Sequence, residues 1–178
     1  TGTAQVITIT VNPTPDVVQP PDQTLCSGNT TNAIQFTGSV GSAVYNWINT
    51  APSIGLAASG TGNIAAFTAI NTTSAPITAT ITVIPSTASC TGTPKAFTIL
   101  VNPMPNVVQP PDQDICSGTA TNAINFTGNV TGTSFNWTNN NPAIGLAASG
   151  TGNIPSFTAI NTTGIPIIAS ITVVPSAL

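Results

Sequence analysis

The chain has 178 residues, and only five of them are charged: Lys95 and the four aspartates Asp16, Asp22, Asp112 and Asp114. Arg, His and Glu are absent, so most side chains that supply acid–base, nucleophilic or metal catalysis are missing. We therefore predict that the protein is not an enzyme and holds no cofactor or metal. One cation is also too few to bind nucleic acid or an anionic membrane surface.

Strand patterns follow one another along the chain, and no segment has the 3.6-residue periodicity of a helix. The first, Val6-Ile7-Thr8-Ile9-Thr10-Val11, places Ile7, Ile9 and Val11 on one face. Similar patterns predict strands at residues 33–37, 44–48, 64–69, 77–84 and 96–101, with short strands at 17–18 and 56–58. Clusters of Gly, Ser, Thr, Asn and Pro at residues 38–42, 59–63 and 71–76 predict turns.

The strands belong to an internal repeat. Residues 11–88 and 101–178 align without a gap at an offset of 90, and 52 of the 78 aligned positions are identical. Residues 1–13 match 91–103, so the chain begins with the tail of a third copy. We predict that residues 1–11 are the last strand of a preceding or neighbouring repeat. Residues 12–101 then form one domain, and 102–178 a second that lacks its final strand.

About seven short strands per repeat favour an immunoglobulin-like β-sandwich in each domain. Trp47 and Trp137 fall in the third strand, where such a sandwich buries its central aromatic residue, and Phe67 and Phe157 occupy matching strand positions. We expect all four side chains in the core. Pro-x-Pro follows the last strand of a repeat at residues 13–15 and 103–105, and such short, stiff linkers predict a rod.

The three cysteines occupy two repeat positions: Cys26 and Cys116 before the second strand, and Cys90 between the last two strands. The expected partner of Cys116 would be residue 180, outside the chain. One cysteine of each type per repeat suggests a Cys26–Cys90 disulfide in an oxidising compartment. In immunoglobulin topology, however, these turns lie at opposite poles, and the alternative is a bridge from Cys26 to the next unit.

Several blocks carry a resemblance: Cys-Ser-Gly, Tyr-Asn-Trp or Phe-Asn-Trp, the stretch from Ile54 to Ile64, Phe-Thr-Ala-Ile-Asn-Thr-Thr and Val-Asn-Pro. Together they resemble the PKD-like, immunoglobulin-like repeats of giant surface proteins of Bacteroidetes, which are exported through the type IX system as adhesins or filaments. The stretch that follows Asn-Trp in PKD domains proper is missing. The resemblance implies an all-β tandem sandwich at the cell surface or outside the cell.

We expect a structural role, as a repeat segment of an extracellular filament, stalk or fibre. The alternative is an adhesin module that binds a glycan or a protein. The partners predicted are adjacent repeats or copies of the chain itself, joined head to tail. Low charge also favours lateral bundling, because like-charge repulsion is weak. We predict no binding of nucleic acid and no membrane insertion.

Two mechanisms could join the units. The family resemblance favours one long covalent chain of which these residues are a part. Alternatively, each subunit is separate, and the strand at residues 4–11 completes the last domain of a neighbour, which ends before its own final strand.

Overall fold

The computed structural model describes residues 2–177. These divide into two compact units, unit 1 up to Asn102 and unit 2 from Pro103 onward. The boundary lies within the repeated Val-Asn-Pro, directly after the last strand of unit 1. No helix in residues 2–177 has the length and apolar character needed to cross a membrane.

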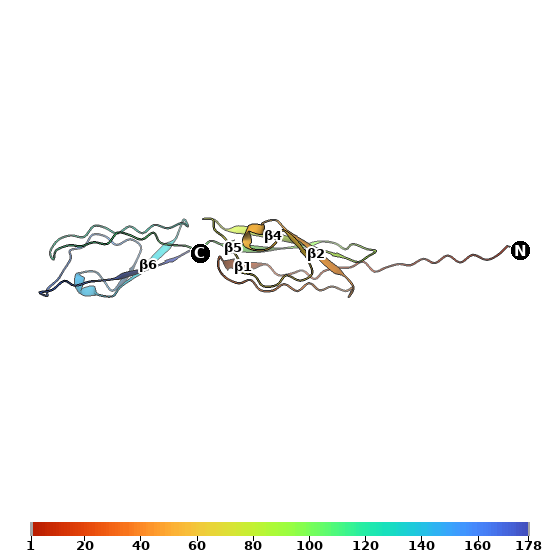
Figure 1. Ribbon diagram of the computed structural model, residues 1–178, viewed down its shortest axis with the longest axis horizontal. Coiled ribbons are helices and arrows are strands. Elements are labelled where there is room, and N and C mark those ends of the chain that lie inside the picture. Colours follow the sequence, from red (N-terminus) through yellow and green to blue (C-terminus); the bar gives the residue numbers. More distant parts are fainter. Residues whose placement is uncertain (1, 178) are drawn as a thin grey trace. The chain divides into compact units, whose positions relative to one another are not determined.

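Unit 1 is organised around a five-stranded sheet in the order β1-β5-β4-β2-β3 (Figure 1). Its elements are β1 Gln23–Cys26, β2 Val44–Asn49, the 3₁₀ turn η1 Pro52–Ile54, β3 Ser59–Thr61, β4 Ile77–Ser86 and β5 Lys95–Asn102. β1 runs parallel to β5, and the other neighbours are antiparallel. Burial alternates along β4 and β5, as expected where one face of a sheet covers a core.

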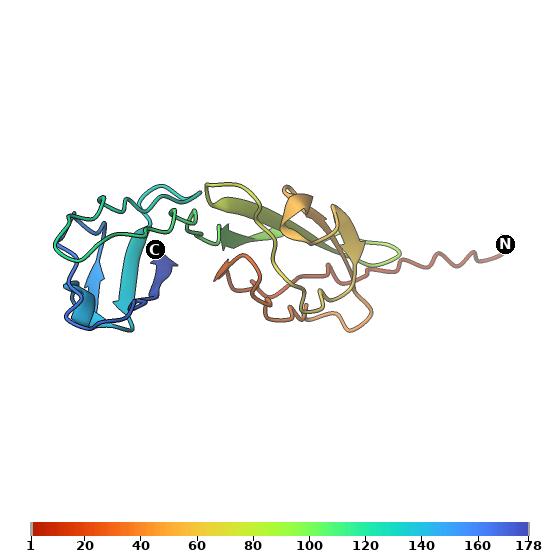
Figure 2. The same ribbon diagram turned by 60° about the vertical axis from the view of Figure 1, so that its left-hand side comes forward.

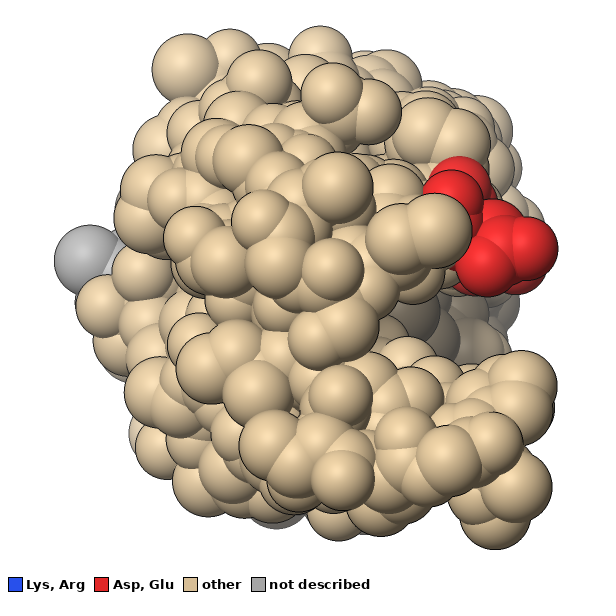
Figure 3. Space-filling view, turned by 90° about the vertical axis from the view of Figure 1, so that its left-hand side faces the viewer, with Lys and Arg blue, Asp and Glu red and all other residues tan. Residues whose placement is uncertain are grey.

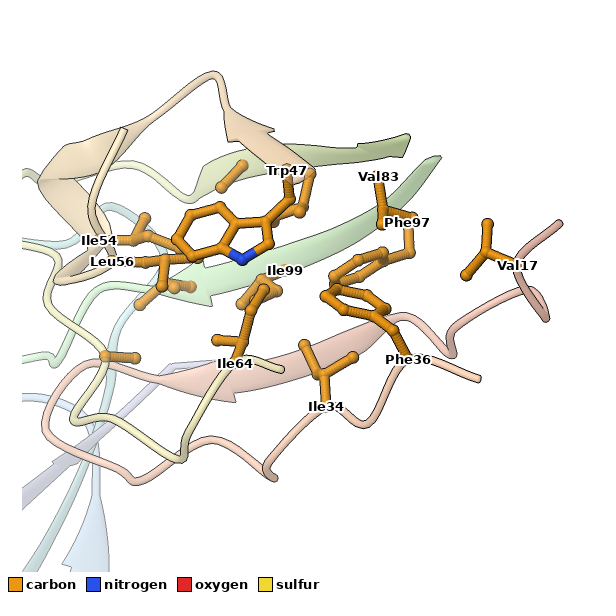
Figure 4. Packing of buried hydrophobic residues seen from close by; sticks show 14 residues of the cluster. Val17, Ile34, Phe36, Trp47, Ile54, Leu56, Ile64, Val83, Phe97 and Ile99 are labelled. Carbon is orange, nitrogen blue, oxygen red and sulfur yellow. The ribbon is translucent and has the colours of Figure 1, made fainter. Parts of the chain in front are cut away.

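A second layer closes the core of unit 1. Two segments pair there through bridges between Thr30 and Thr68 and between Ile34 and Ile64. Figure 4 shows Ile34 and Phe36 from this layer facing Phe97 and Ile99 of β5, with all four side chains buried. Two β layers around an alternating core form the immunoglobulin-like β-sandwich that the strand count predicted.

Unit 2 repeats part of this arrangement with a three-stranded sheet in the order β7-β6-β8. Its elements are β6 Ser134–Asn139, the 3₁₀ turn η2 Pro142–Ile144, β7 Ser149–Thr151 and β8 Ile171–Ser176. Bridges join Ala120 to Thr158 and Ile124 to Ile154, at the positions used by the second layer of unit 1. Its buried cluster is smaller and contains Phe126, Phe135, Trp137, Leu146 and Ile154.

The predicted strands at 44–48, 77–84 and 96–101 are confirmed as β2, β4 and β5, and those at 33–37 and 64–69 contact each other only through single bridges. The predicted strand at 56–58 is wrong, and of the turn predicted at 59–63 only the bend at Gly62, with a φ of 75°, is confirmed, because Ser59–Thr61 form β3. Pro52 starts a 3₁₀ turn that Gly55 ends with a φ of 95°, which shifts the strand to Ser59–Thr61. Residues 17–18 form no strand, although Val17 is buried and the Val18 N–H donates to the Thr37 carbonyl.

β3 packs so closely on β2 that its central position has no space for a side chain. Gly60 lies opposite Trp47, and a Cβ atom at Gly60 would be 2.2 Å from Cζ2 of the indole. The Trp47 Nε1–H donates to the Gly62 carbonyl at 3.1 Å, which fixes the ring over β3. In unit 2, a Cβ atom at Gly150 would likewise be 2.3 Å from Cζ2 of Trp137.

We predict that Gly60→Ala destabilises unit 1 by about 1–3 kcal/mol, because the indole must leave its position to admit one methyl group. Gly41→Ala is the matched control, since a Cβ atom there meets nothing within 4 Å. Chemical denaturation of both variants measures the difference. Equal stabilities would show that the Trp47 contact imposes no constraint.

The turn before β2 is fastened differently in the two units. In unit 1 the carboxylate of Asp16 accepts hydrogen bonds from the backbone N–H of Ser39 at 2.6 Å and from its hydroxyl at 2.7 Å. These bonds lower the pKa of Asp16 below its ordinary value of 3.8. In unit 2, Asn106 and Asn129 exchange reciprocal N–H to Oδ1 bonds of 2.9 Å.

Asp16 therefore contributes stability above its ordinary pKa and loses it as the pH falls through the lower pKa of the folded state. We predict that the Tm falls less between about pH 5 and pH 2.5 in Asp16→Asn than in the unchanged chain. Thermal unfolding at both pH values measures this. Asp114→Asn is the control, since its carboxylate does not accept the pair of hydrogen bonds that the Asp16 carboxylate accepts from Ser39. An equal fall in Tm would contradict it.

Candidate interaction site

The candidate interaction site is the position that β5 occupies in the sheet of unit 1 and its counterpart in unit 2. β5 lies between two strands: Gln23 to Cys26 of β1 pair with Ile99 to Asn102, and Ile77 to Val83 of β4 pair with Val101 to Lys95. Its inward side chains, Phe97, Ile99 and Val101, are all buried in the core. β5 therefore connects β1 to the rest of the sheet and covers one side of the core.

Three side chains and one main-chain N–H from outside the sheet also hold the backbone of β5. Gln19 Nε2 donates to the Ala96 carbonyl at 2.7 Å, and Asn71 Nδ2 donates to the Val101 carbonyl at 2.8 Å. The Thr98 N–H donates to the Asp22 carboxylate at 2.6 Å, and the Ser27 N–H donates to the Asn102 carbonyl at 2.8 Å. We call Gln19, Asp22, Ser27 and Asn71 the strand clamp; all four residues hold backbone atoms of β5 whatever its side chains.

Unit 2 contains the same clamp residues without such a strand. At the offset of 90, Gln109, Asp112, Ser117 and Asn161 are identical to the clamp of unit 1. In residues 2–177 no strand pairs with residues 113–116 or with residues 167–170, although their counterparts form β1 and the first part of β4. Asn161 Nδ2 keeps its bond to the Ile165 carbonyl at 2.9 Å, which corresponds to the Asn71 bond to Ala75.

A groove of about 870 Å³ lies where this strand is missing in unit 2. Its walls come from residues 109–117 on one side and 166–173 on the other, with Ile124, Phe126 and Phe157 among the residues of its floor. Figure 3 shows acidic side chains beside a hollow on this side of the molecule, and Asp112 and Asp114 line the groove. The groove combines apolar side chains with unpaired backbone, which is the composition that accepts an extended peptide.

Burial confirms that the groove exposes core residues. Ala79, Ile81 and Val83 of β4 are all 0% exposed, whereas Ala169, Ile171 and Val173 are each partly exposed. Since these residues are identical in the two copies, the difference comes from the missing neighbour and not from the side chains.

The predicted inter-unit strand, Val6-Ile7-Thr8-Ile9-Thr10-Val11, is unpaired. Figures 1 and 2 show the first residues of the chain as an extended segment that leaves the sandwich of unit 1. Ile9 is 84% exposed, whereas Ile99, which takes its place in the repeat, is 0% exposed in β5. Val6, Ile7 and Val11 are exposed to a similar extent. This segment therefore presents to solvent the residues that β5 buries.

The cysteines lie at opposite ends of β5. Cys26 pairs with Asn102, while Cys90 lies in the turn before Lys95, so the two cysteines are separated by more than the length of β5, about 23 Å. A disulfide requires Cα atoms within about 7 Å. Cys26, Cys90 and Cys116 are all free thiols. Cys90 Sγ lies 4.0 Å from the carbonyl oxygen of Asn12.

The four predicted core aromatics lie at two levels of burial. Trp47 and Trp137 are each 7% exposed, and Phe67 and Phe157 pack partly buried against the two clusters. Every other aromatic side chain is also buried or half-buried: Phe36, Tyr45, Phe97, Phe126 and Phe135. Among residues 2–177, no group of three His, Cys, Asp or Glu side chains could hold a metal ion.

No model of a protein family and no curated protein matches the chain. Among solved structures, the chain is similar to the crystal structure of DIP-gamma IG1+IG2, with 10% sequence identity and a TM-score of 0.49. The similarity covers 90% of this chain and 95% of that one.

The sequence did not identify the clamp. The strand at Gln23–Cys26 was not predicted, because Gln-Thr-Leu-Cys is too short and too mixed to show alternation. Gln19, Asp22, Ser27 and Asn71 lie in Pro-rich or turn-like stretches that suggest linkers. Their identity in both copies was the available signal, but identity at so many other positions concealed it.

We predict that all three thiols of the folded chain react with an alkylating reagent, with Cys90 slowest because it is the least exposed. Mass spectrometry of the labelled chain counts the adducts. A peptide linked through Cys26 and Cys90 would contradict the separation imposed by the register of β1 and β5.

Proposed function

We propose that the chain is a structural module of an extracellular fibre or stalk, built from immunoglobulin-like units joined head to tail. The observation that supports this role best is the path of the chain through unit 1. The chain enters beside the turn before β5 and leaves at Asn102, the opposite end of that strand. A module entered at one pole and left at the other can be repeated without limit.

The entry point is firmly attached. Pro15 is fully buried, and a Cβ atom at Gly92 would lie 1.8 Å from the Pro15 carbonyl oxygen, so the linker packs directly on the turn between β4 and β5. A pull between Pro15 and Asn102 acts along β5. It loads the bonds of β5 to β1 and β4 together instead of opening them singly.

The surface supports a mechanical role over the alternative of an adhesin module. Binding energy at protein interfaces concentrates in exposed Trp, Tyr and Arg side chains. This chain has no Arg, and all its aromatic side chains in residues 2–177 are buried or half-buried. The exposed large apolar residues among residues 2–177 are all Val, Ile or Met. An extracellular location is consistent with the resemblance to surface repeats and with a surface nearly free of charge.

We predict that single-molecule pulling on tandem repeats gives regular unfolding events, each of which releases about 90 residues, or roughly 300 Å of extended chain. Gly60→Ala in one unit should lower the force of one event and leave the others unchanged. A glycan array probed with the same protein should give no signal above background. Specific glycan binding, or events without a regular length, would contradict the structural role.

A further inference from the structure

We propose that residues 5–12 of a second copy of this chain fill the groove of unit 2 and pair there in the register of β5. This inference rests on the proposed function, since a head-to-tail array requires a joint. Its basis is internal to the molecule: unit 1 shows the groove filled, unit 2 shows it open, and residues 5–12 are the repeat counterpart of the strand that fills it.

The register of unit 1 specifies the contacts. Transferred by 90 positions, it places Ile9 of the second copy between Ala169 and Gln113, as Ile99 lies between Ala79 and Gln23. Ile7 then faces Ile171, by analogy with Phe97 and Ile81. Side chains that are now exposed on both partners become buried in one step.

The clamp of unit 2 suits the incoming backbone. By the same transfer, Gln109 and Asn161 donate to the carbonyls of Val6 and Val11, and Asp112 accepts the Thr8 N–H. These bonds involve only main-chain atoms of the strand. They are therefore unaffected by the side-chain differences between residues 5–12 and β5.

The differences that do exist are compatible with burial. Ile7 replaces Phe97, and Phe126 is the aromatic residue it would face, as Phe97 faces Phe36 with ring centroids 6.5 Å apart. Gln5 replaces Lys95, so the segment carries no charge into the groove. Between Val6 and Val11 no polar side chain is turned inward, because Thr8 and Thr10 alternate with Ile7 and Ile9.

Chain connectivity favours a second copy over the chain's own segment. Only Pro13 and Thr14 separate the strand from buried Pro15, at the pole of unit 1 where the chain enters. Unit 2 continues from Asn102, at the opposite pole. Two residues reach at most about 7 Å, much less than the 23 Å length of β5.

The first test compares two single-charge variants in sedimentation. The unchanged chain should form concentration-dependent oligomers. Ile9→Lys puts a charge into the apolar floor and should leave monomers, whereas Thr10→Lys, one residue later, points outward beside Asp114 and should keep the oligomers. Ile9 and Thr10 are both exposed in the single chain, so neither variant should impair folding.

The second test isolates binding. A synthetic peptide of residues 3–13 is added to the Ile9→Lys chain, whose groove is intact. The peptide should bind with one site per chain and raise the Tm of unit 2. The peptide carrying the Ile9 change should bind roughly a hundredfold more weakly, and the Thr10 change should alter affinity by less than about threefold.

The third test identifies which ends meet. Cys116 would pair with Asn12 of the second copy, as Cys26 pairs with Asn102, and Cys90 of that copy lies beside its own Asn12. A short bis-maleimide should therefore join Cys90 of one copy to Cys116 of the next. Cys116→Ser should abolish the ladder of crosslinked chains, and Cys26→Ser should retain it.

The inference would be overturned if the unchanged chain stayed monomeric and the Ile9→Lys chain bound no peptide. A chain that fills its own groove would give this result, because it would stay monomeric and exclude the peptide. Oligomers formed equally by Ile9→Lys would show another interface. None of these outcomes affects the pulling and glycan measurements, so failure of the joint and failure of the structural role are distinguishable.

Discussion

The pairing of β5 with two neighbours is the interaction on which the sandwich of unit 1 depends. In unit 1 this strand attaches β1 to the sheet and buries Phe97, Ile99 and Val101 in the core. Its backbone is held by the strand clamp of Gln19, Asp22, Ser27 and Asn71. Unit 2 has nearly the same residues without that strand, and its sheet is reduced to three strands. The two copies thus form a comparison within one molecule, in which a single strand is the main difference.

The near absence of charge is compatible with joints that depend on strand pairing. In the array that we propose, the joints are made by apolar side chains and main-chain hydrogen bonds, which need no ion pairs and respond little to salt. Solvent-facing positions carry Thr, Ser, Asn and Gln, which bond to water and to neighbouring backbone. Two of the few charged residues, Asp22 and Asp112, occupy the same repeat position. Asp22 accepts a hydrogen bond from a backbone N–H of β5, and Asp112 is its counterpart in unit 2.

Exposed strand edges normally favour aggregation, and proteins protect them with charges, prolines or bulges. The groove of unit 2 has some of this protection, since Pro110, Pro111, Asp112, Asp114 and Pro166 line it, but Ile168 lies 82% exposed beside it. In the proposed joint, the clamp also gives the incoming strand a specific register. An incoming strand shifted by one residue would turn Thr8 and Thr10 into the apolar floor, so alternation selects one alignment.

The sequence by itself determined the all-β class, the repeat of 90 residues and the alternation of β4 and β5, because each is a local pattern of side chains. The phase of the repeat predicts an inter-unit strand at residues 4–11, and in the structure this segment is exposed and unpaired. Only the tertiary structure revealed that β1 runs parallel beside β5, that the clamp residues meet around it, and that Cys26 and Cys90 lie apart. Those facts depend on which distant segments become neighbours, and sequence periodicity carries no information about that choice.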